Sequence, residues 1–267
     1  MENEKQHEIQ RYYTALYEAW GPQHWWPAET QFEVIVGAYL TQNTAWTNVE
    51  RALANLRDAN LLSVEAIRKV PLTRLQRLIR SSGYFRQKAQ RLKTFVAYVD
   101  EHYAGSLQNM FSQPTDKLRE ELLSLNGVGP ETADSILLYA GNHPVFVVDA
   151  YTRRVVSRHE IAAENTAYQE IRQLFQRALE PLAREQERHP APLEPRSTDT
   201  LRGAAHHPSA MSTAHRTALV QVYNEMHGLI VGVGKNYCRK KEPACDECPL
   251  GNFLTSKTSP YEKRPRK

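Results

Sequence analysis

The sequence predicts an all-α fold, and three observations lead to this prediction. Apolar residues recur at three- and four-residue spacing along most of the chain, as they do on the buried face of a helix. Alternation with a period of two, which indicates a half-buried strand, is rare. Capping residues, glycines and prolines separate the apolar segments at intervals suited to helices. At 267 residues with 41% hydrophobic content, the chain can form one large domain or two modest ones.

The charge of the chain is small overall and uneven in distribution. The net charge is +4, but residues 66–99 contain nine Lys or Arg and no Asp or Glu, and residues 235–267 contain nine basic and four acidic residues. Such positive stretches on a nearly neutral body favour a polyanionic partner. A solvated helix face or a solubilising tail explains any one of them equally well.

The sequence lacks the features of a membrane span and of a signal peptide. Its apolar runs are all shorter than the roughly eighteen residues of a membrane-spanning helix. The N-terminus MENEKQHEIQ is polar and charged. We therefore expect a cytoplasmic, nucleoid-associated protein without a membrane partner.

The N-terminal part of the chain is predicted to form two helices joined by a loop. Apolar residues recur through residues 5–20, and the following Gly-Pro ends that helix. Thr30 and Glu33 form a capping box that opens the second helix. In the loop between the helices, Trp25 and Trp26 are either a hydrophobic latch, which is the commoner use of such large rings, or part of a ligand pocket.

The middle of the chain is predicted to be a series of helices with polar breaks. The segment TQNT interrupts two apolar stretches and places Gln42, Asn43 and Trp46 at a helix-to-helix turn. Thr115 or Asp116 is the expected cap of a later helix. Further helices are expected at residues 63–69, 72–80, 84–99, 116–125, 150–160, 168–182 and 218–234.

The stretch LNGVGPETA at residues 125–133 has the composition of a tight turn that opens a helix. Gly127 and Gly129 allow positive φ and expose backbone amides. Val128 can anchor the turn in the core, and Pro130 suits the first turn of the following helix. Free amides at a helix start bind anions such as phosphate. A plain turn between two helices is the alternative.

A carboxylate follows this turn in the sequence. The short apolar run PVFVV stops at Asp149, and helical periodicity resumes directly after it. Asp149 is therefore expected at a helix N-cap, and capping alone explains an Asp there. Because it follows the glycine turn by twenty residues, it would also be a carboxylate held on the same side of the fold.

The three cysteines form one cluster. They fall between residues 238 and 248 with the spacing C-x6-C-x2-C. An odd, clustered set of thiols in a cytosolic protein argues for metal or iron–sulfur chemistry and against a disulfide framework. Cys238, Cys245 and Cys248 are therefore candidate metal ligands.

Together these motifs resemble those of a known family. The elements L-x-G-V-G, A-D-S-I-L-L-Y-A, V-V-D and R-R-V in residues 125–155 resemble the helix-hairpin-helix and Gly/Pro-rich loop with Asp (HhH-GPD) of the endonuclease III superfamily of DNA glycosylases. The resemblance extends to LTQNTAW, SSGYFRQKAQRL, HGLIVGVGKNYC and the cysteine segment. It covers most of residues 28–182 and 216–254, and the combined pattern is specific although each piece alone is not.

The resemblance implies a helix-hairpin-helix DNA glycosylase fold, with two helical lobes and a DNA cleft between them. We expect DNA to contact the hairpin amides and the basic 66–99 region, with Asp149 at the floor of the cleft. The expected parts are a six-helix lobe at 31–145 that ends in the hairpin, a second helical lobe from 1–30, 146–182 and 215–237, a flexible insertion at 183–214, a cysteine loop of degenerate iron–sulfur type at 238–254 and a basic tail at 255–267.

One position departs from the strand-cleaving members of the family. Members that are also lyases have a Schiff-base lysine where this chain has Glu131, so the resemblance implies a monofunctional glycosylase. A glutamate here, together with the WWP and QNT-x-aromatic segments, is most similar to the branch that removes alkylated purines such as 3-methyladenine. That resemblance assigns the pocket for the flipped base to Trp25, Trp26, Pro27, Trp46 and Glu131.

The resemblance also implies a division of roles on the DNA. A glycosylase must extrude its target base from the stack, and Gln42 and Asn43 are expected to fill the gap as a wedge. Asp149 is expected to stabilise the positive charge that develops on the sugar and to orient the attacking water. The DNA backbone is assigned to Gly127, Val128, Gly129, Thr132, Arg86 and Lys88.

The cysteine segment departs from the family pattern. The family's iron–sulfur loop continues with a fourth cysteine, where this chain has Leu254. A [4Fe–4S] cluster normally takes four protein ligands. The loop therefore holds a cluster with another fourth ligand, binds nothing, or is a relic. No organic cofactor is expected.

We therefore expect a monomeric enzyme that hydrolyses the N-glycosidic bond of a flipped damaged base, an alkylated one first of all, in double-stranded DNA. Its product would be an abasic site. The competing enzyme is an endonuclease III-type glycosylase and abasic-site lyase acting on oxidised pyrimidines, which the missing lysine disfavours. A rival of another class is a non-catalytic DNA-structure binder that uses the hairpin alone.

Overall fold

The computed structural model describes residues 2–188 and 203–254, and these residues form helices, turns and loops without a strand. The all-α prediction is confirmed. The predicted basic tail at 255–267 and residues 189–202 of the predicted insertion lie outside the described residues. The helices are α1 (Glu2–Trp20), α2 (Gln31–Thr41), α3 (Trp46–Asp58), α4 (Val64–Lys69), α5 (Leu72–Leu78), α6 (Phe85–Tyr103), α7 (Leu107–Phe111), α8 (Thr115–Ser124), α9 (Pro130–Ser135), α10 (Ala150–Arg158), α11 (Tyr168–Arg188) and α12 (Ala218–Asn236).

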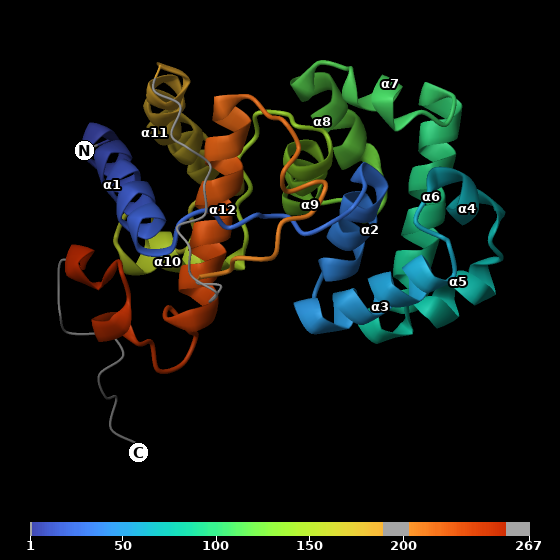
Figure 1. Cartoon of the computed structure of the whole chain (residues 1–267), viewed down its shortest axis with the longest axis horizontal. Coiled ribbons are helices and arrows are strands. Elements are labelled where there is room, and N and C mark those ends of the chain that lie inside the picture. The colour runs from blue at the N-terminus through green and yellow to red at the C-terminus, as the bar shows by residue number, and fades with distance from the viewer. Residues whose placement is uncertain (1, 189–202, 255–267) are drawn as a thin grey trace. The chain divides into compact units, whose positions relative to one another are not determined.

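Short helical segments complete the architecture. The 3-10 segments are η1 (Arg80–Ser82), η3 (Cys245–Glu247) and η4 (Gly251–Phe253), and α9 continues into the π-helical segment η2 (Ile136–Ala140). The chain divides into two compact units (Figure 1). Unit 1 comprises Met1–Trp25, Phe146–Pro208 and Arg216–Lys267, and unit 2 comprises Trp26–Val145 and Ser209–His215.

Unit 2 is built around α2. This helix is buried from Phe32 to Leu40 and packs against α3, α6, α9 and η2. Its start is fixed by the predicted capping box, because Thr30 Oγ1 accepts the N–H of Glu33 at 3.1 Å and the Glu33 carboxylate accepts the N–H of Glu29 at 3.0 Å. The capping box therefore fixes where α2 begins.

Unit 1 is built around α12, which packs against α1, α10 and α11 (Figure 1). Almost the whole of α12 from Val220 to Gly234 is buried. Gly232 allows another segment to approach the helix closely, since a Cβ there would lie 2.8 Å from the backbone N of Ala204. A helix that is apolar on all sides, as α12 nearly is, is the expected centre of a unit.

Several helix ends differ from the prediction, and two of the differences have a clear structural reason. The helix α11 ends at Arg188 rather than at residue 182, because its apolar stripe continues past Pro181 through the buried Ala183. The N-cap of α8 is Pro114, without a side-chain cap bond, and Thr115 Oγ1 lies 2.9 Å from His143 Nδ1 instead. Spacing therefore found both helices but misplaced one end of each.

The described part of the predicted flexible insertion makes regular contacts. Within unit 1, the backbone N–H of Ala204 donates to Gln23 Oε1 at 2.8 Å. Within unit 2, the backbone N–H of Met211 donates to the carbonyl of Ala28 at 3.0 Å. The described part of this segment is thus hydrogen-bonded to its neighbours, and the flexibility expected of the insertion stays a prediction.

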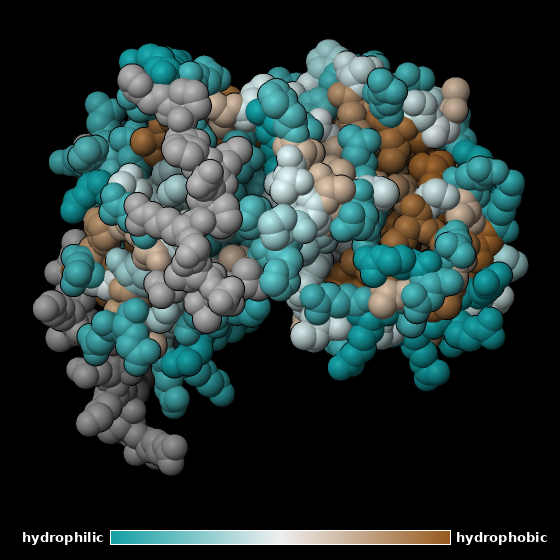
Figure 2. Space-filling model, viewed as in Figure 1, coloured by the Kyte–Doolittle hydropathy of each residue, from teal (hydrophilic) through white to brown (hydrophobic). Residues whose placement is uncertain are grey.

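On the face shown in Figure 2, hydrophilic residues surround a hydrophobic area of unit 2. Every helix in the described ranges is too short or too polar to span a bilayer. Tyr84 is the large hydrophobic residue that the described chain leaves well exposed, with 68% of its surface accessible.

Candidate active site

The glycine turn between α8 and α9 has the local structure that the sequence predicts. Gly127 has a φ of +80°, and the N–H of Val128 donates to the carbonyl of Leu125 at 3.0 Å. Val128 is only 7% exposed and holds the turn against the core of unit 2. Gly129 is the N-cap of α9 and Pro130 occupies its first turn. The hairpin thus presents exposed backbone at Gly127 and Gly129.

The two glycines of the hairpin have different reasons to be glycine. A Cβ on Gly127 would lie 2.0 Å from Arg91 Nε, whereas a Cβ on Gly129 would meet nothing within 4 Å. Gly129 has a φ of −92°, so only Gly127 uses the left-handed conformation. The tight turn that the two glycines were expected to allow therefore draws on the positive φ of Gly127 alone.

A side-chain clamp fixes the hairpin to the turn after α2. Gln42 Nε2 donates to the carbonyl of Gly127 and to Thr132 Oγ1, each at 3.0 Å. Gln42 Oε1 accepts from Arg91 Nη1 at 2.7 Å. Both ends of the Gln42 amide are therefore engaged inside unit 2. A role for Gln42 as a DNA wedge stays a prediction, and it would require these hydrogen bonds to break.

Asn43 keeps the features expected of a wedge. It is exposed and has a φ of +53°, a left-handed conformation that Asn tolerates better than most residues. Its position at the turn between α2 and α3 agrees with the sequence prediction. The wedge role itself stays a prediction.

Besides Val128, two of the residues assigned to the DNA backbone are buried. Lys88 is 1% exposed, and its Nζ donates to the carbonyls of Leu40 at 2.8 Å and Ser82 at 2.7 Å. Burial lowers the pKa of Lys88 to about 8. Thr132 is 7% exposed and accepts from the Gln42 amide. Packing of α6 and α9 covers both side chains, so contact of either one with phosphate, which stays a prediction, would require it to leave these partners.

Arg86 and its neighbour Tyr84 lie on the surface of unit 2. Arg86 is exposed, as its assignment to the DNA backbone requires. Sequence reasoning did not single out Tyr84, which is 68% exposed and has a φ of +44° just before α6. An exposed aromatic ring on a strained backbone is uncommon and often marks a binding site. The signal in the sequence was the aromatic pair after Gly83, but spacing does not tell which ring is outside.

The structure brings two of the predicted pocket residues together in unit 2. The rings of Trp26 and Trp46 meet edge to face at 5.1 Å, and Trp26 also lies 5.3 Å from the ring of Tyr139. Trp26 is 5% exposed, whereas Trp46 is half-buried and donates from Nε1 to Glu50 Oε1 at 2.8 Å. Trp46 is therefore the more accessible indole of this pair, and its place in a base pocket stays a prediction.

The remaining pocket residues of unit 2 lie at its surface. Pro27 is half-buried and Glu131 is exposed on the first turn of α9. Trp25, the other pocket candidate, belongs to unit 1 and is half-buried. Its ring centroid lies 6.0 Å from that of His227 and 5.4 Å from that of His206.

Asp149 is the N-cap of α10, as predicted. Its Oδ1 accepts both the backbone N–H of Thr152 at 2.7 Å and the Thr152 hydroxyl at 2.9 Å. Its Oδ2 lies 3.8 Å from His227 Nε2, and its side chain is 14% exposed. One oxygen of the carboxylate is thus occupied by the cap while the carboxylate keeps some access to solvent. Such a group can accept a proton from water or stabilise a nearby cation.

Comparison with known proteins identifies the family. The family model for HhH-GPD superfamily base excision DNA repair proteins matches residues 36–181. A putative DNA repair glycosylase of Methanocaldococcus jannaschii is 41% identical over 96% of this chain and 100% of its own length. The chain belongs to the HhH-GPD superfamily. Endonuclease III of Thermotoga maritima, a more distant relative, is 25% identical over 83% of this chain and 81% of its own.

Solved structures agree with this assignment. The H. pylori 3-methyladenine DNA glycosylase bound to 1,N6-ethenoadenine matches with a TM-score of 0.66 and 26% identity, over 86% of this chain and 97% of that one. A non-covalent endonuclease III–DNA complex matches with a TM-score of 0.66 at 18% identity, over 96% of this chain and 95% of that one. The predicted helix-hairpin-helix glycosylase fold is confirmed, as is the resemblance to the 3-methyladenine branch.

The cysteine loop does not fit a four-cysteine cluster of the HhH-GPD type. Cys238, Cys245, Cys248 and Leu254 line one small cavity of unit 1, so an apolar side chain stands where the fourth ligand would be. No three His, Cys, Asp or Glu side chains of the described residues are grouped so that they could hold a metal ion. Arg158 Nη1 donates to Cys238 Sγ at 3.2 Å.

Arginines hold this loop to unit 1. Arg158 Nη1 donates to the carbonyl of Arg239 at 2.7 Å, and its Nη2 donates to the carbonyl of Lys240 at 3.2 Å. Arg154 donates to the carbonyls of Cys238 and Gly234. The backbone of the loop is therefore anchored by guanidinium groups of α10, independently of any metal.

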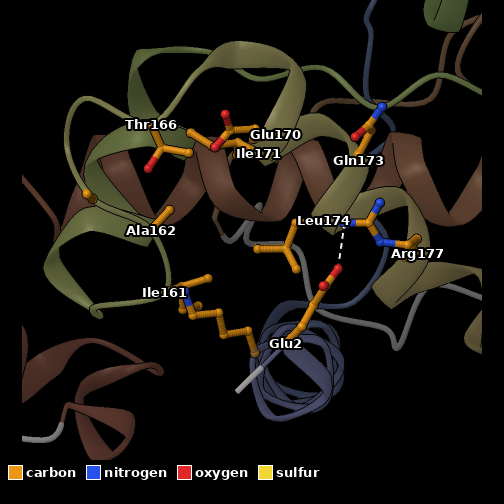
Figure 3. A pocket seen from close by; sticks show the side chains of 11 residues that line it. Glu2, Ile161, Ala162, Thr166, Glu170, Ile171, Gln173, Leu174 and Arg177 are labelled. Atoms are coloured by element: carbon orange, nitrogen blue, oxygen red, sulfur yellow. Dashed lines mark hydrogen bonds and ion pairs between the residues drawn. The ribbon is translucent and has the colours of Figure 1, made fainter.

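A larger pocket of unit 1 lies elsewhere. It has a volume of about 530 Å³ and lies among α1, α11 and the segment between α10 and α11 (Figure 3). Leu174 points into it, and Arg177 pairs with Glu2 at 2.7 Å. None of the residues assigned to the HhH-GPD site lines this pocket.

Proposed function

We propose that this chain is a monofunctional DNA glycosylase that removes an alkylated base from double-stranded DNA and leaves an abasic site with the strand intact. The observation that carries the proposal is the carboxylate of Asp149, which is fixed by the cap of α10 through one oxygen and remains partly accessible. Its position in the V-V-D motif of an HhH-GPD protein agrees with a catalytic role.

The chemistry requires little more than one anion and one water. A purine alkylated at a ring nitrogen such as N3 or N7 is cationic, so its base is already a good leaving group and no strong general acid is needed. Positive charge then develops on the sugar, and the Asp149 carboxylate would stabilise it. The same carboxylate would orient or deprotonate the attacking water.

The aromatic and backbone groups of unit 2 suit binding of the flipped base and of the DNA phosphates. The half-buried ring of Trp46 offers an electron-rich face to a cationic purine. The exposed amides of Gly127 and Gly129 and the guanidinium of Arg86 suit phosphate oxygens. The 3-methyladenine DNA glycosylase of H. pylori, with ethenoadenine bound, is consistent with an alkylated purine as the substrate.

The test is a base-release assay on duplexes that each contain one lesion, namely an alkylated purine, an oxidised pyrimidine, uracil or a G·T mismatch. We expect release of the alkylated purine by the wild type. Asp149→Asn keeps an oxygen that can accept from Thr152, so the helix cap and DNA affinity should survive while base release falls by roughly 100-fold or more. If none of the lesions is released, the proposal is wrong and the DNA-structure binder is the better account.

The competing bifunctional enzyme is separated by its covalent intermediate. A lyase forms a Schiff base through a lysine, whereas this chain has the exposed Glu131 at the corresponding position. Borohydride treatment during reaction on damaged duplex should therefore trap no protein–DNA adduct. An adduct that forms in proportion to base release would contradict monofunctional chemistry.

A further inference from the structure

We propose that His227 of α12 is a positioning residue for Asp149, and that it holds the carboxylate in the orientation that base release requires. The inference rests on the proposed function and adds a residue to it. His227 lies in the HGLIVGVGKNYC segment, whose histidine was given no role by the sequence.

The two oxygens of Asp149 face different partners. Oδ1 is held by the backbone and hydroxyl donors of Thr152. Oδ2 faces His227 Nε2 at 3.8 Å, which is too long for a direct hydrogen bond but within the range of a charge–dipole contact. Hydrogen bonds therefore fix Oδ1, and the electrostatic contact with His227 favours one position of Oδ2. Together the two partners define the plane of the carboxylate.

The imidazole of His227 is itself held on two sides. It is 4% exposed, and the ring of Phe146 packs edge to face against it at 6.3 Å. The ring of Trp25 lies 6.0 Å away. An imidazole with this burial has few alternative rotamers, since interiors are close-packed. Because its imidazole is held in place on α12, His227 presents Nε2 to Asp149 in one fixed position.

The same turn of α12 fixes the segment that carries Trp25. Glu225 Oε2 accepts the backbone N–H of Gln23 at 2.8 Å. Gly228 leaves space for this segment, because a Cβ there would lie 3.0 Å from the Gln23 Cβ and 3.1 Å from the Trp25 Cβ. Residues 225–228 thus place both Trp25 and Asp149 from one rigid helix, which is how a site is kept in a productive geometry.

The charge of His227 suits a positioning role. Burial lowers the pKa of His227, and the nearby Asp149 only partly opposes this shift. A neutral imidazole with its proton on Nε2 can orient Oδ2 while leaving the carboxylate its negative charge. A protonated imidazole would neutralise the charge that the sugar cation needs.

The activity test compares His227→Leu and His227→Gln with the wild type in single-turnover base release on an alkylated duplex. We expect His227→Leu to slow release by about tenfold to a hundredfold, with DNA affinity changed less than about twofold, as for a misplaced catalytic group. The acid limb of its pH–rate profile should move to higher pH, because a donor facing the anion is lost. His227→Gln keeps an N–H and should recover most of the rate.

The matched control is His159→Gln, which changes another buried histidine of unit 1 whose Nδ1 lies 2.9 Å from the Tyr12 hydroxyl. It should lower thermal stability without changing the rate or the pH profile. A wild-type rate and pH profile in folded His227→Leu would overturn the inference. If His227→Leu does not fold, a rate loss in His227→Gln as large as that of Asp149→Asn would overturn it equally.

A second measurement needs no substrate and separates this inference from the proposed function. Nitrogen-15 NMR of the histidines should show His227 as the Nε2–H tautomer in the wild type, and its pKa should fall further in Asp149→Asn because a negative charge is removed. Failure of base release with these shifts intact would contradict only the proposed function. An Nδ1–H tautomer, or identical His227 signals in both proteins, would contradict the positioning role.

Discussion

At the scale of single residues, Asp149 shows how one side chain serves structure and chemistry together. Its Oδ1 caps α10, while its Oδ2 faces His227 and its carboxylate keeps partial access to solvent. From the sequence, capping alone was a sufficient explanation for an Asp at this position. The geometry adds that capping occupies only one oxygen, so the two explanations are compatible.

Gln42 and Asn43 are adjacent in the sequence but differ in what they contact. Gln42 ties Gly127 and Thr132 to the turn after α2, whereas Asn43 is exposed. We expect Gln42→Ala to weaken DNA binding and to lower the melting temperature, because a half-buried polar clamp is lost, at a cost of about 1 kcal/mol. Asn43→Ala should leave the melting temperature unchanged and slow base release. Thermal melts and single-turnover assays of both variants check this, and equal losses of stability would contradict the distinction.

Glu225 gives a dependence of stability on pH. Burial raises its pKa from 4.5 to about 7, so the folded protein holds a proton that the unfolded chain releases in this window. The free energy of unfolding therefore falls by about 3 kcal/mol at most as pH rises from about 4.5 to 7. Above pH 7 it stays at the lower value. Glu225→Gln keeps an acceptor for the N–H of Gln23 and should remove this loss. Melting temperatures of the wild type and Glu225→Gln at pH 5 and pH 8 check this. The same change of melting temperature with pH in both proteins would exclude Glu225 as the cause.

At the scale of elements, the local sequence pattern predicted the helices and the hairpin turn. It did not predict how the helices pack against one another. The hairpin follows from Gly127 and Pro130, because turn geometry depends on neighbours in the sequence. The burial of Lys88 depends on how α6 lies against the end of α2, and no spacing within α6 reveals the carbonyls that surround its ammonium group. The sequence pattern could not predict the exposure of Tyr84 for the same reason, since exposure also depends on packing between helices.

The cysteine loop is the element whose sequence left the most alternatives open. Leu254 lines the same small cavity as the three cysteines, and Arg158 hydrogen-bonds to the thiol of Cys238. We expect the wild type to bind far fewer than about four irons per chain after anaerobic reconstitution with iron and sulfide. Leu254→Cys should bind about four and acquire the visible absorption of an iron–sulfur cluster.

The matched control for this experiment is Leu254→Ser, which has nearly the size of the cysteine variant but lacks a thiol. It should behave as the wild type does in iron content and absorption. A full complement of iron in the wild type would mean that another residue supplies the fourth ligand and that the loop still works as a cluster site.

At the scale of the whole molecule, the positive charge available to DNA is smaller than the sequence suggests. Of the nine basic residues between 66 and 99, several are engaged inside unit 2. Arg68 pairs with Asp100, and Lys93 donates to the carbonyls of Arg68 and Val70. Lys88 and Arg91 are also engaged, whereas exposed guanidinium groups remain at Arg74, Arg77, Arg80 and Arg86.

This division predicts how DNA affinity responds to salt. Each phosphate contact that a variant removes should reduce the slope of log Kobs against log salt by about 1. Arg86→Ala should therefore weaken binding and flatten the slope, because its guanidinium is exposed. Lys88→Met should leave the slope unchanged and lower the melting temperature, since its ammonium group bonds only to carbonyls inside unit 2. Titrations of undamaged duplex between about 50 and 200 mM salt check this, and a flattened slope for folded Lys88→Met would show that its ammonium group reaches DNA after all.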